Sequence, residues 1–157
     1  MVFSDSHGDF APLRDIVMTH KNAGLFIHLG DGELDAVKLA EEFPQKTFLY
    51  VRGNCDRGID TPAEATAFFH GKKIFYAHGQ FLRVKSSPQW FIERAADAKA
   101  DIALFGHTHE VFVTTLESGM HVMNPGSTAA PRGEGAFRSY GLIDIKDDTV
   151  AMQIVKI

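Results

Sequence analysis

The sequence predicts an α/β fold, a four-layer α/β/β/α sandwich in which two mixed sheets are flanked by helices. Two features of the chain predict it. In the first half, short apolar segments alternate with amphipathic ones, which is the order of a parallel sheet with crossover helices. In the second half, a hairpin and one further helix are followed mainly by strands, which indicates a second mixed sheet with a helix outside it.

The first half has the order β-α-β-α-β. Val2 and Phe3 end a short strand, and Asp9 followed by Pro12 is typical of a helix start. Gly24 and Pro44 are typical of residues that follow a helix. The spacing of apolar residues predicts helices over residues 12–21 and 35–43, and strands over 25–29 and 47–51.

The second half is predicted to contain mostly strands. The expected elements are hairpin strands over 64–69 and 74–77, a helix over 88–98, and strands over 101–105, 111–117, 121–124, 140–144 and 149–155. Residues 126–135 are rich in glycine and are expected to form a surface loop. The chain has 157 residues without a repeat or a linker, so we expect one domain over residues 1–157.

Composition and charge exclude several classes of function. The net charge is -4 and no basic stripe occurs, so an extended surface for DNA or RNA is not expected. No apolar run reaches membrane length, so no membrane association is expected. The single cysteine rules out an internal disulfide, which favours a reducing, cytoplasmic location. The shortness of the first strand leaves open whether the natural chain begins upstream of Met1.

Polar residues able to bind a metal recur at the carboxyl ends of the expected strands. They are Asp5, His7, Asp31, Asn54, His78, His107 and His109. Ligands of open α/β sheets bind at this edge, and most of these residues adjoin a glycine, which permits a sharp turn. Taken singly, each residue has an ordinary explanation as a cap, a turn residue or a core histidine. Five such groups at successive strand ends favour one shared metal site.

The same motifs, taken in order, also carry a resemblance to a known family. They are Asp5-Ser6-His7, Gly30-Asp31, Gly53-Asn54-Cys55-Asp56, His78-Gly79, Gly106-His107-Thr108-His109 and Asn124-Pro125-Gly126-Ser127. This series resembles the calcineurin-like metallophosphoesterase superfamily, and its small bacterial and archaeal phosphodiesterase branch in particular. The resemblance extends over essentially the whole chain.

The resemblance implies a centre of two divalent metal ions. One ion would be held by Asp5, His7, Asp31 and His109, and the other by Asp31, Asn54, His78 and His107, with the Asp31 carboxylate bridging. Manganese is the first expectation, with iron, zinc, nickel or cobalt as alternatives, because mixed nitrogen and oxygen ligands suit these ions better than calcium or magnesium. The resemblance gives catalytic roles to Asp31, Asn54 and His107.

The implied activity is that of a dinuclear-metal-dependent phosphoesterase acting on a small phosphate ester. Phosphodiester hydrolysis is expected, with a metal-bridging hydroxide attacking phosphorus in line. The alternative is a non-catalytic protein-interaction scaffold on the same fold, as in the small retromer subunit. The filled ligand positions favour the enzyme. Apolar residues near Phe81, Leu82 and Trp90 leave open a homodimer or a higher homo-oligomer, or simply inward packing.

One position departs from the pattern of the family. Much of the superfamily has a histidine after Gly-Asn that orients or protonates the leaving group, and this chain has Cys55 there. A thiol is a poorer acid for this purpose, so substrates whose leaving groups depart readily should be preferred. Cys55 also admits a redox-sensor interpretation, which the absence of a second cysteine weakens. Asp56 is expected to support its loop rather than take part in the chemistry.

The remaining polar and aromatic residues have ordinary interpretations. Loop arginines Arg52, Arg57 and Arg132 are expected to be solvated, although each could face a phosphate. Structural roles are expected for the other histidines and core positions for several aromatic residues: His20, His28, His70, His121, Trp90, Phe91, Phe105 and Phe112.

Overall fold

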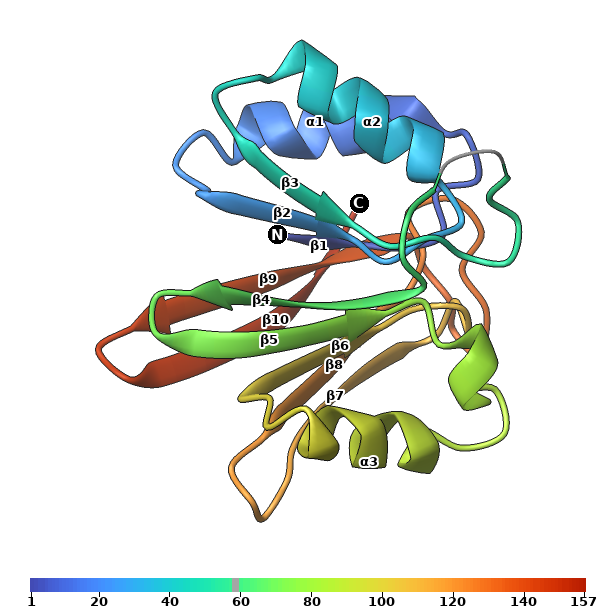
Figure 1. Ribbon diagram of the computed structural model, residues 1–157. Coiled ribbons are helices and arrows are strands. Elements are labelled where there is room, and N and C mark those ends of the chain that lie inside the picture. Colours follow the sequence, from blue (N-terminus) through green and yellow to red (C-terminus); the bar gives the residue numbers. More distant parts are fainter. Residues whose placement is uncertain (58–59) are drawn as a thin grey trace.

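The computed structural model describes residues 1–57 and 60–157 and contains two five-stranded mixed sheets. The sheets pack face to face, with two helices outside the first sheet and one outside the second (Figure 1). The predicted four-layer α/β/β/α architecture is therefore confirmed. No helix within these described ranges has the length and apolar character of a membrane-spanning segment.

The first sheet combines the start and the end of the chain. Its strand order is β10-β9-β1-β2-β3, with β1, β2 and β3 parallel, β9 antiparallel to β1, and β10 antiparallel to β9. The bounds are Val2–Phe3 (β1), Leu25–His28 (β2), Thr47–Tyr50 (β3), Ser139–Lys146 (β9) and Thr149–Lys156 (β10). Helices α1 (Phe10–Thr19) and α2 (Glu33–Glu42) connect the parallel strands and cover the outer face of the sheet (Figure 1).

The second sheet is formed by the middle of the chain. Its strand order is β4-β5-β6-β8-β7, in which β5, β6 and β8 are parallel and the outer strands β4 and β7 are antiparallel to their neighbours. The bounds are Glu64–Phe69 (β4), Lys72–Ala77 (β5), Ile102–Phe105 (β6), Val111–Thr115 (β7) and His121–Pro125 (β8). A short 3-10 helix η1 (Gln80–Leu82) and helix α3 (Gln89–Asp97) lie between β5 and β6.

Three apolar layers hold the sandwich together. The central layer lies between the sheets and includes Val2, Ile27, Leu29, Ile74, Tyr76, Ile102, Leu104 and Met123. In the second layer Leu13 and Val17 of α1 pack on Phe3 and Phe26, and in the third Phe91 of α3 packs with residues of β5 and β6. Burial of this apolar surface is the main stabilising contribution to the fold, and it positions the strand ends.

The structure corrects two sequence predictions. Residues 126–135 are not a surface loop throughout, because Gly126, Ser127 and Thr128 are buried, whereas 132–135 are exposed. Trp90 is not in the core. It is 52% exposed and lies against the Arg83 guanidinium, because α3 turns Phe91 and Ala95 inward instead.

The other aromatic and apolar predictions agree with the structure. Phe91 and Phe105 are buried and Phe112 packs partly against the same layer. Of the residues considered for a dimer face, Phe81 is 71% exposed, whereas Leu82 packs partly inward.

Candidate metal centre

The candidate ligands all follow the carboxyl ends of parallel strands. Asp5 and His7 follow β1, Asp31 follows β2, and Asn54 follows β3 in the first sheet. His78 follows β5, and His107 and His109 follow β6, in the second sheet. Because β1, β2 and β3 are parallel to one another, as are β5 and β6, their carboxyl ends meet at one edge of the sandwich, and the loops from both sheets gather there (Figure 1).

The backbone at five of these residues is in the left-handed region. The φ angles are 54° at Asp5, 48° at His7, 54° at Asp31, 68° at His107 and 64° at His109. Residues other than glycine rarely adopt positive φ, and each instance costs about 1–3 kcal/mol unless the surroundings enforce it. The concentration of this strain at one edge is typical of a functional site.

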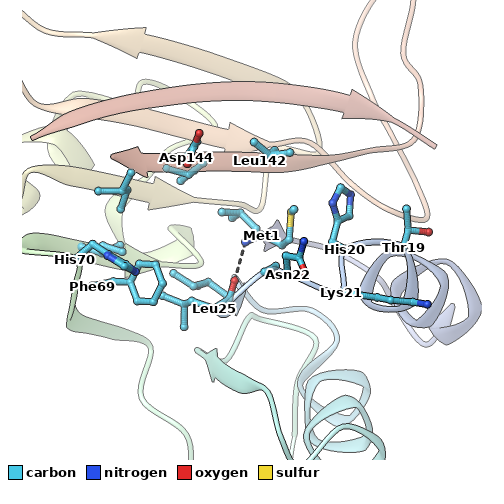
Figure 2. Close-up of a pocket in the computed structure, with 17 residues that line it drawn as sticks. Met1, Thr19, His20, Lys21, Asn22, Leu25, Phe69, His70, Leu142 and Asp144 are labelled. Carbon is cyan, nitrogen blue, oxygen red and sulfur yellow. Dashed lines mark hydrogen bonds between the residues drawn. The ribbon is translucent and has the colours of Figure 1, made fainter. Parts of the chain in front are cut away.

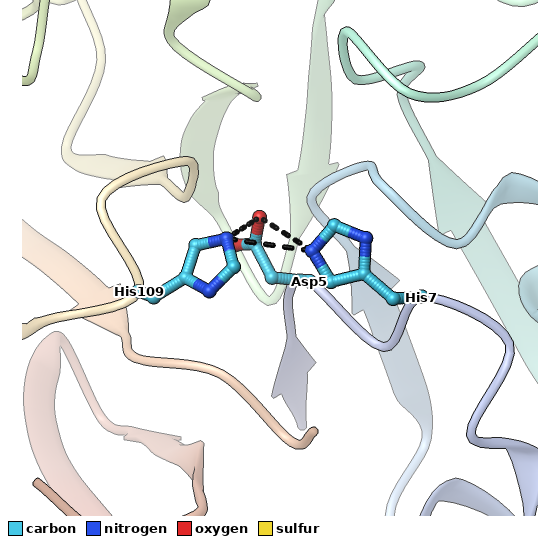
Figure 3. A group of neighbouring side chains, drawn as sticks. All are labelled: Asp5, His7 and His109. Carbon is cyan, nitrogen blue, oxygen red and sulfur yellow. Dashed lines mark hydrogen bonds and ion pairs between the residues drawn. The ribbon is translucent and has the colours of Figure 1, made fainter. Parts of the chain in front are cut away.

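The first group of ligands surrounds one carboxylate oxygen. Oδ1 of Asp5 lies 3.1 Å from Nε2 of His109, 4.0 Å from Nε2 of His7 and 4.0 Å from Nε2 of His78. Figure 3 shows the imidazoles of His7 and His109 pointing toward this carboxylate from opposite sides. Oδ1 is buried and, within the described part of the chain, accepts no hydrogen bond of regular geometry. An unpaired buried oxygen of this kind is costly unless another group, such as a cation, binds it.

The second group lies around His78. Its Nε2 is 3.5 Å from Oδ2 of Asp31, 3.1 Å from Nδ1 of His107 and 3.3 Å from Oδ1 of Asn54. Ligand atoms of Asp31, His78 and His107 all lie within 4.8 Å of one another. The group offers both nitrogen and oxygen atoms, which suits a transition-metal dication.

Asp31 lies between the two groups. Its carboxylate belongs to the cluster with His78 and His107, and it also lies within 4.8 Å of a ligand atom of His7 in a third cluster that includes Cys55. A carboxylate has two oxygens, and that of Asp31 shares a cluster with His78 and His107 and another with His7.

Two imidazoles are oriented by main-chain carbonyls. Nδ1 of His78 is 2.7 Å from the oxygen of Leu29, and Nδ1 of His109 is 2.6 Å from the oxygen of Ala130. A carbonyl only accepts hydrogen bonds, so each Nδ1 must carry the proton. Each ring is thereby held with its Nε2 directed into the site, which is the usual orientation of metal-binding histidines.

Asp56 holds the loops that carry the ligands. Its carboxylate accepts hydrogen bonds from the backbone N–H groups of Asp31 (2.7 Å), Gly32 (2.9 Å), Glu33 (3.0 Å) and Gly53 (2.7 Å). This geometry agrees with the predicted supporting role, since both carboxylate oxygens are used by the main chain. Asp56 thereby joins the loop after β2 to the loop after β3.

The protonation states suit metal binding. Burial raises the pKa of the Asp5 carboxyl, but nearby His109 and His78 outweigh this effect and keep the pKa below its usual value. Burial also raises the pKa of the Asp31 carboxyl, but nearby His78 outweighs this effect, so the pKa is lowered overall. Burial and the proximity of His78 lower the pKa of His107 to about 4. Both carboxylates are therefore ionised and His107 is neutral at pH 7, the forms in which these groups bind metals.

Cys55 is exposed beside this site but is not activated. Burial of the thiol and the adjacent Asp31 raise its pKa. Its Sγ lies 3.2 Å from Nδ2 of Asn54, an amide donor. A thiol with a raised pKa is neither a strong acid nor a reactive thiolate, so the redox interpretation gains no support from its surroundings.

Several supporting residues were not predicted from the sequence. Ser127 donates a hydrogen bond to the Asp5 carbonyl (2.7 Å) and accepts one from the N–H of Ala130 (2.8 Å), which ties the loop after β8 to the site. Asp35 of α2 accepts hydrogen bonds from Ser6 Oγ (2.7 Å) and Gly8 N–H (3.0 Å) on either side of His7. The quoted Asn124-Pro125-Gly126-Ser127 motif was a signal for Ser127, whereas Asp35 has no local signal.

The other basic residues considered lie outside the two ligand groups. Arg52 and Arg57 are exposed, and the backbone N–H of Arg132 donates to the carbonyl of His109 (3.0 Å). His28 is buried and accepts the Gly30 N–H at 3.1 Å, as expected for a structural histidine. Likewise His20 pairs with the hydroxyl of Tyr140 and His121 with that of Thr115.

Comparison with known proteins adds an independent finding. The family model of the calcineurin-like phosphoesterase superfamily domain matches residues 1–148. The probable metallophosphoesterase YsnB of Bacillus subtilis is 31% identical over 154 residues, which cover 98% of this chain and 88% of YsnB.

Solved structures agree with this comparison. A conserved Streptococcus pneumoniae protein described as a predicted phosphoesterase has a TM-score of 0.86 at 27% identity, covering 99% of this chain and 87% of its own. Zinc-bound Vps29 of Entamoeba histolytica has a TM-score of 0.73 at 19% identity, covering 99% and 97%, and so shares the fold.

Proposed function

Because this chain belongs to the calcineurin-like phosphoesterase superfamily, we propose that it is a phosphodiesterase whose site holds two divalent cations. The observation that carries the proposal is the buried Asp5 Oδ1, which faces three imidazoles and accepts no regular hydrogen bond from the described residues. Together with Asp31 between two ligand groups, it supports two adjacent cation sites.

The residues present fit two cations. Asp5, His7, Asp31 and His109 would hold one, and Asp31, Asn54, His78 and His107 would hold the other. Bound there, the two cations would lower the pKa of a water molecule and offset the charge that develops on the phosphoryl oxygens. The two carboxylates do not neutralise two dications, so the loaded site would be net positive and would attract an anionic phosphate ester. Manganese remains our first expectation.

Groups of the chain itself orient the side chains of this site. The carbonyls of Leu29 and Ala130 fix the Nε2 atoms of His78 and His109, and Asp56 fixes the loop that carries Asn54. Asn54 is exposed and His107 is half-buried, so both side chains can reach a substrate phosphate. We assign them, with Asp31, to the catalytic group.

The leaving group receives little help from the protein. Cys55 follows Asn54, and its raised pKa makes it a weak proton donor. We therefore propose that the natural substrate is a small phosphodiester with a leaving group that departs readily, such as an aryl or cyclic nucleotide ester. Alkyl esters should react more slowly.

A panel of substrates tests this function. Metal-free protein is reloaded with Mn²⁺, Fe²⁺, Zn²⁺, Ni²⁺ or Co²⁺ and assayed with a bis-aryl phosphodiester, an aryl phosphomonoester, cyclic nucleotides and single-stranded DNA. We expect metal-dependent hydrolysis of the small diesters and little cleavage of DNA. Absence of turnover with every metal and substrate would overturn the proposal.

The same experiment decides the alternative function. The likeness to Vps29 keeps a non-catalytic scaffold under consideration, because the fold alone does not distinguish the two. All seven ligand positions of this chain carry residues able to bind a metal, which supports the enzyme. Metal uptake without turnover would favour the scaffold.

A further inference from the structure

A third cluster of ligand atoms adjoins the proposed metal centre and includes a thiol. His7, Asp31 and Cys55 each offer one atom, and these three atoms lie within 4.8 Å of one another. Ligand atoms lie about 2.0–2.3 Å from an ion such as zinc, so small side-chain movements would bring all three onto one ion. His7 and Asp31 already belong to the first of the two ligand groups, whereas Cys55 has no ligand role in either.

The main chain holds Cys55 against the Asp31 carboxylate. The backbone N–H of Cys55 donates to Oδ1 of Asp31 at 2.7 Å. A Cβ atom at Gly53 would collide with the same carboxylate, so the loop approaches Asp31 this closely because residue 53 is glycine. Asp56 fixes the loop further by accepting the N–H of Gly53. The position of Cys55 is therefore set by the fold.

The Asn54 amide separates the thiol from the second ligand group. Its Nδ2 donates to Sγ of Cys55 at 3.2 Å, and its Oδ1 lies 3.3 Å from Nε2 of His78. The two ends of the amide thus face different parts of the site. The thiol belongs with His7 and Asp31, and not with His78.

A buried charge beside His7 favours a cation on this side of the centre, independently of the thiol. Oδ1 of Asp5 is fully buried, accepts no regular hydrogen bond from the described residues, and lies 4.0 Å from Nε2 of His7. A buried and unpaired carboxylate oxygen attracts a positive ion. The His7 side chain is 31% exposed and Cys55 is also exposed, so an ion from solution has access to both.

The third cluster differs from the other two in the softness of its ligands. Imidazole and carboxylate suit many dications, but a thiolate selects zinc and similar soft ions, whereas manganese favours oxygen ligands. A dication that binds Cys55 displaces the thiol proton, which passes to solvent as the bond from sulfur to the metal forms. The charges of the Asp31 carboxylate and the thiolate together offset those of the ion. Such an ion would attract an anionic ester only weakly.

We propose that His7, Asp31 and Cys55 bind a thiophilic dication, with zinc as the expected ion, and that this ion competes with Mn²⁺ for His7 and Asp31. The inference rests on the proposed function only through these two shared ligands. In an active enzyme, zinc bound in this way would inhibit the manganese-supported reaction.

Cobalt spectroscopy tests the thiolate ligand directly. Metal-free protein is titrated with Co²⁺, which replaces zinc as a visible probe, and a sulfur-to-cobalt charge-transfer band in the near ultraviolet is measured. Cys55 is the only cysteine of the chain, so the band has one possible source. We expect the band in the wild type and its loss in Cys55→Ser. Cobalt that binds the wild type without this band would overturn the proposal.

Alkylation of the thiol tests the preference between ions. The rate of reaction of Cys55 with iodoacetamide is measured for metal-free protein and with saturating Zn²⁺ or Mn²⁺. We expect Zn²⁺ to slow the reaction by about 10-fold or more, and Mn²⁺ to slow it much less, because only a thiolate bound to the metal loses its reactivity. Equal rates with the two ions would contradict the proposed selectivity.

His7→Gln distinguishes a built site from a lone exposed thiol. Loss of this ligand should raise the Zn²⁺ concentration needed for half-protection by about 10-fold or more, since even the loss of an outer partner has an effect of this size. The matched control is His70→Gln, which alters an exposed imidazole next to Phe69 in the turn between β4 and β5 (Figure 2). Equal protection in the two variants would show that the thiol binds zinc alone, and would overturn the proposal.

Neither readout depends on turnover, so the two proposals fail separately. A thiolate band and zinc protection in a protein that hydrolyses no ester would support this site and contradict the phosphodiesterase. Manganese-supported hydrolysis without the band and without zinc protection would do the reverse.

Discussion

Asp5 Oδ1 and His109 Nε2 lie 3.1 Å apart, although Asp5 follows a strand of the first sheet and His109 follows a strand of the second. The contact joins the two sheets at the edge where the other candidate ligands also meet. The site therefore exists only when the sandwich has formed, and a cation bound there would bind the folded state selectively. Metal should then stabilise the protein by mass action.

Removal of the chelatable metal should lower thermal stability. We expect protein reloaded with Mn²⁺ to unfold several degrees above the metal-free protein, with a Tm that rises with metal concentration. Scanning calorimetry over a concentration series measures this shift. An unchanged Tm throughout the series would show that the cluster binds no cation of this class.

Replacement of the central carboxylate should abolish turnover. Asp31→Asn removes a charge that both ligand groups share, so we expect a loss of ~100-fold or more in metal-dependent phosphoesterase activity. The matched control is Asp148→Asn, which alters a fully exposed carboxylate in the β9–β10 turn. Wild-type rates in the Asp31 variant, with the metal content intact, would contradict the assignment.

Asp56 should affect stability and metal affinity together. Asp56→Ala leaves four backbone N–H groups without their acceptor, so we expect a loss of about 2–4 kcal/mol in the free energy of unfolding. Metal affinity should also weaken, because these N–H groups position Asp31 and the loop of Asn54. Urea unfolding and metal titration measure the two effects, with exposed Asp15→Ala as control. A variant as stable as wild type would rule out the supporting role.

Cys55 offers a test of leaving-group chemistry. Cys55→His introduces an imidazole with a pKa nearer to neutrality, so hydrolysis of alkyl esters should rise by about 10-fold or more relative to aryl esters. Cys55→Ser controls for loss of the thiol. The measured quantity is the ratio of kcat/KM for two diesters that differ only in the leaving group. If the histidine and serine variants show the same ratio, position 55 does not act on the leaving group.

Buried His28 should make the metal-free protein less stable in mild acid. Burial lowers the pKa of His28 to about 4, below the value of 6.5 for an exposed imidazole. The unfolded chain therefore binds a proton between pH 6.5 and 4 that the folded protein does not, so stability falls as the pH falls through this range.

The size of the effect follows from the same difference in pKa. Between pH 7 and pH 5 this residue should account for about 2 kcal/mol of the free energy of unfolding. Comparison of urea unfolding of wild type and His28→Gln at both pH values isolates this contribution from the other histidines. Equal pH dependence in the two proteins would show that His28 is not held neutral by the fold.

Local sequence signals predicted the strand ends and therefore most of the site. Asp31 and His78 each follow an apolar strand beside a glycine, so their positions could be predicted without knowledge of the fold. The pairing of segments that lie far apart in the sequence could not be predicted from such local signals. Nothing near Ser139 indicates that β9 returns to the first sheet beside β1, and nothing near Asp35 indicates its contact with Ser6. Such contacts depend on how the sheets assemble, which local patterns do not encode.

Anomalous diffraction from crystals of the manganese-loaded protein tests the central claim most directly. Two peaks are predicted at one edge of the sandwich, with Asp31 between them. One peak should lie within about 2.0–2.3 Å of ligand atoms of Asp5 and His109, and the other should lie within the same distance of ligand atoms of His78 and His107. No peak at this edge in protein saturated with Mn²⁺, or peaks bound by other side chains, would contradict the account.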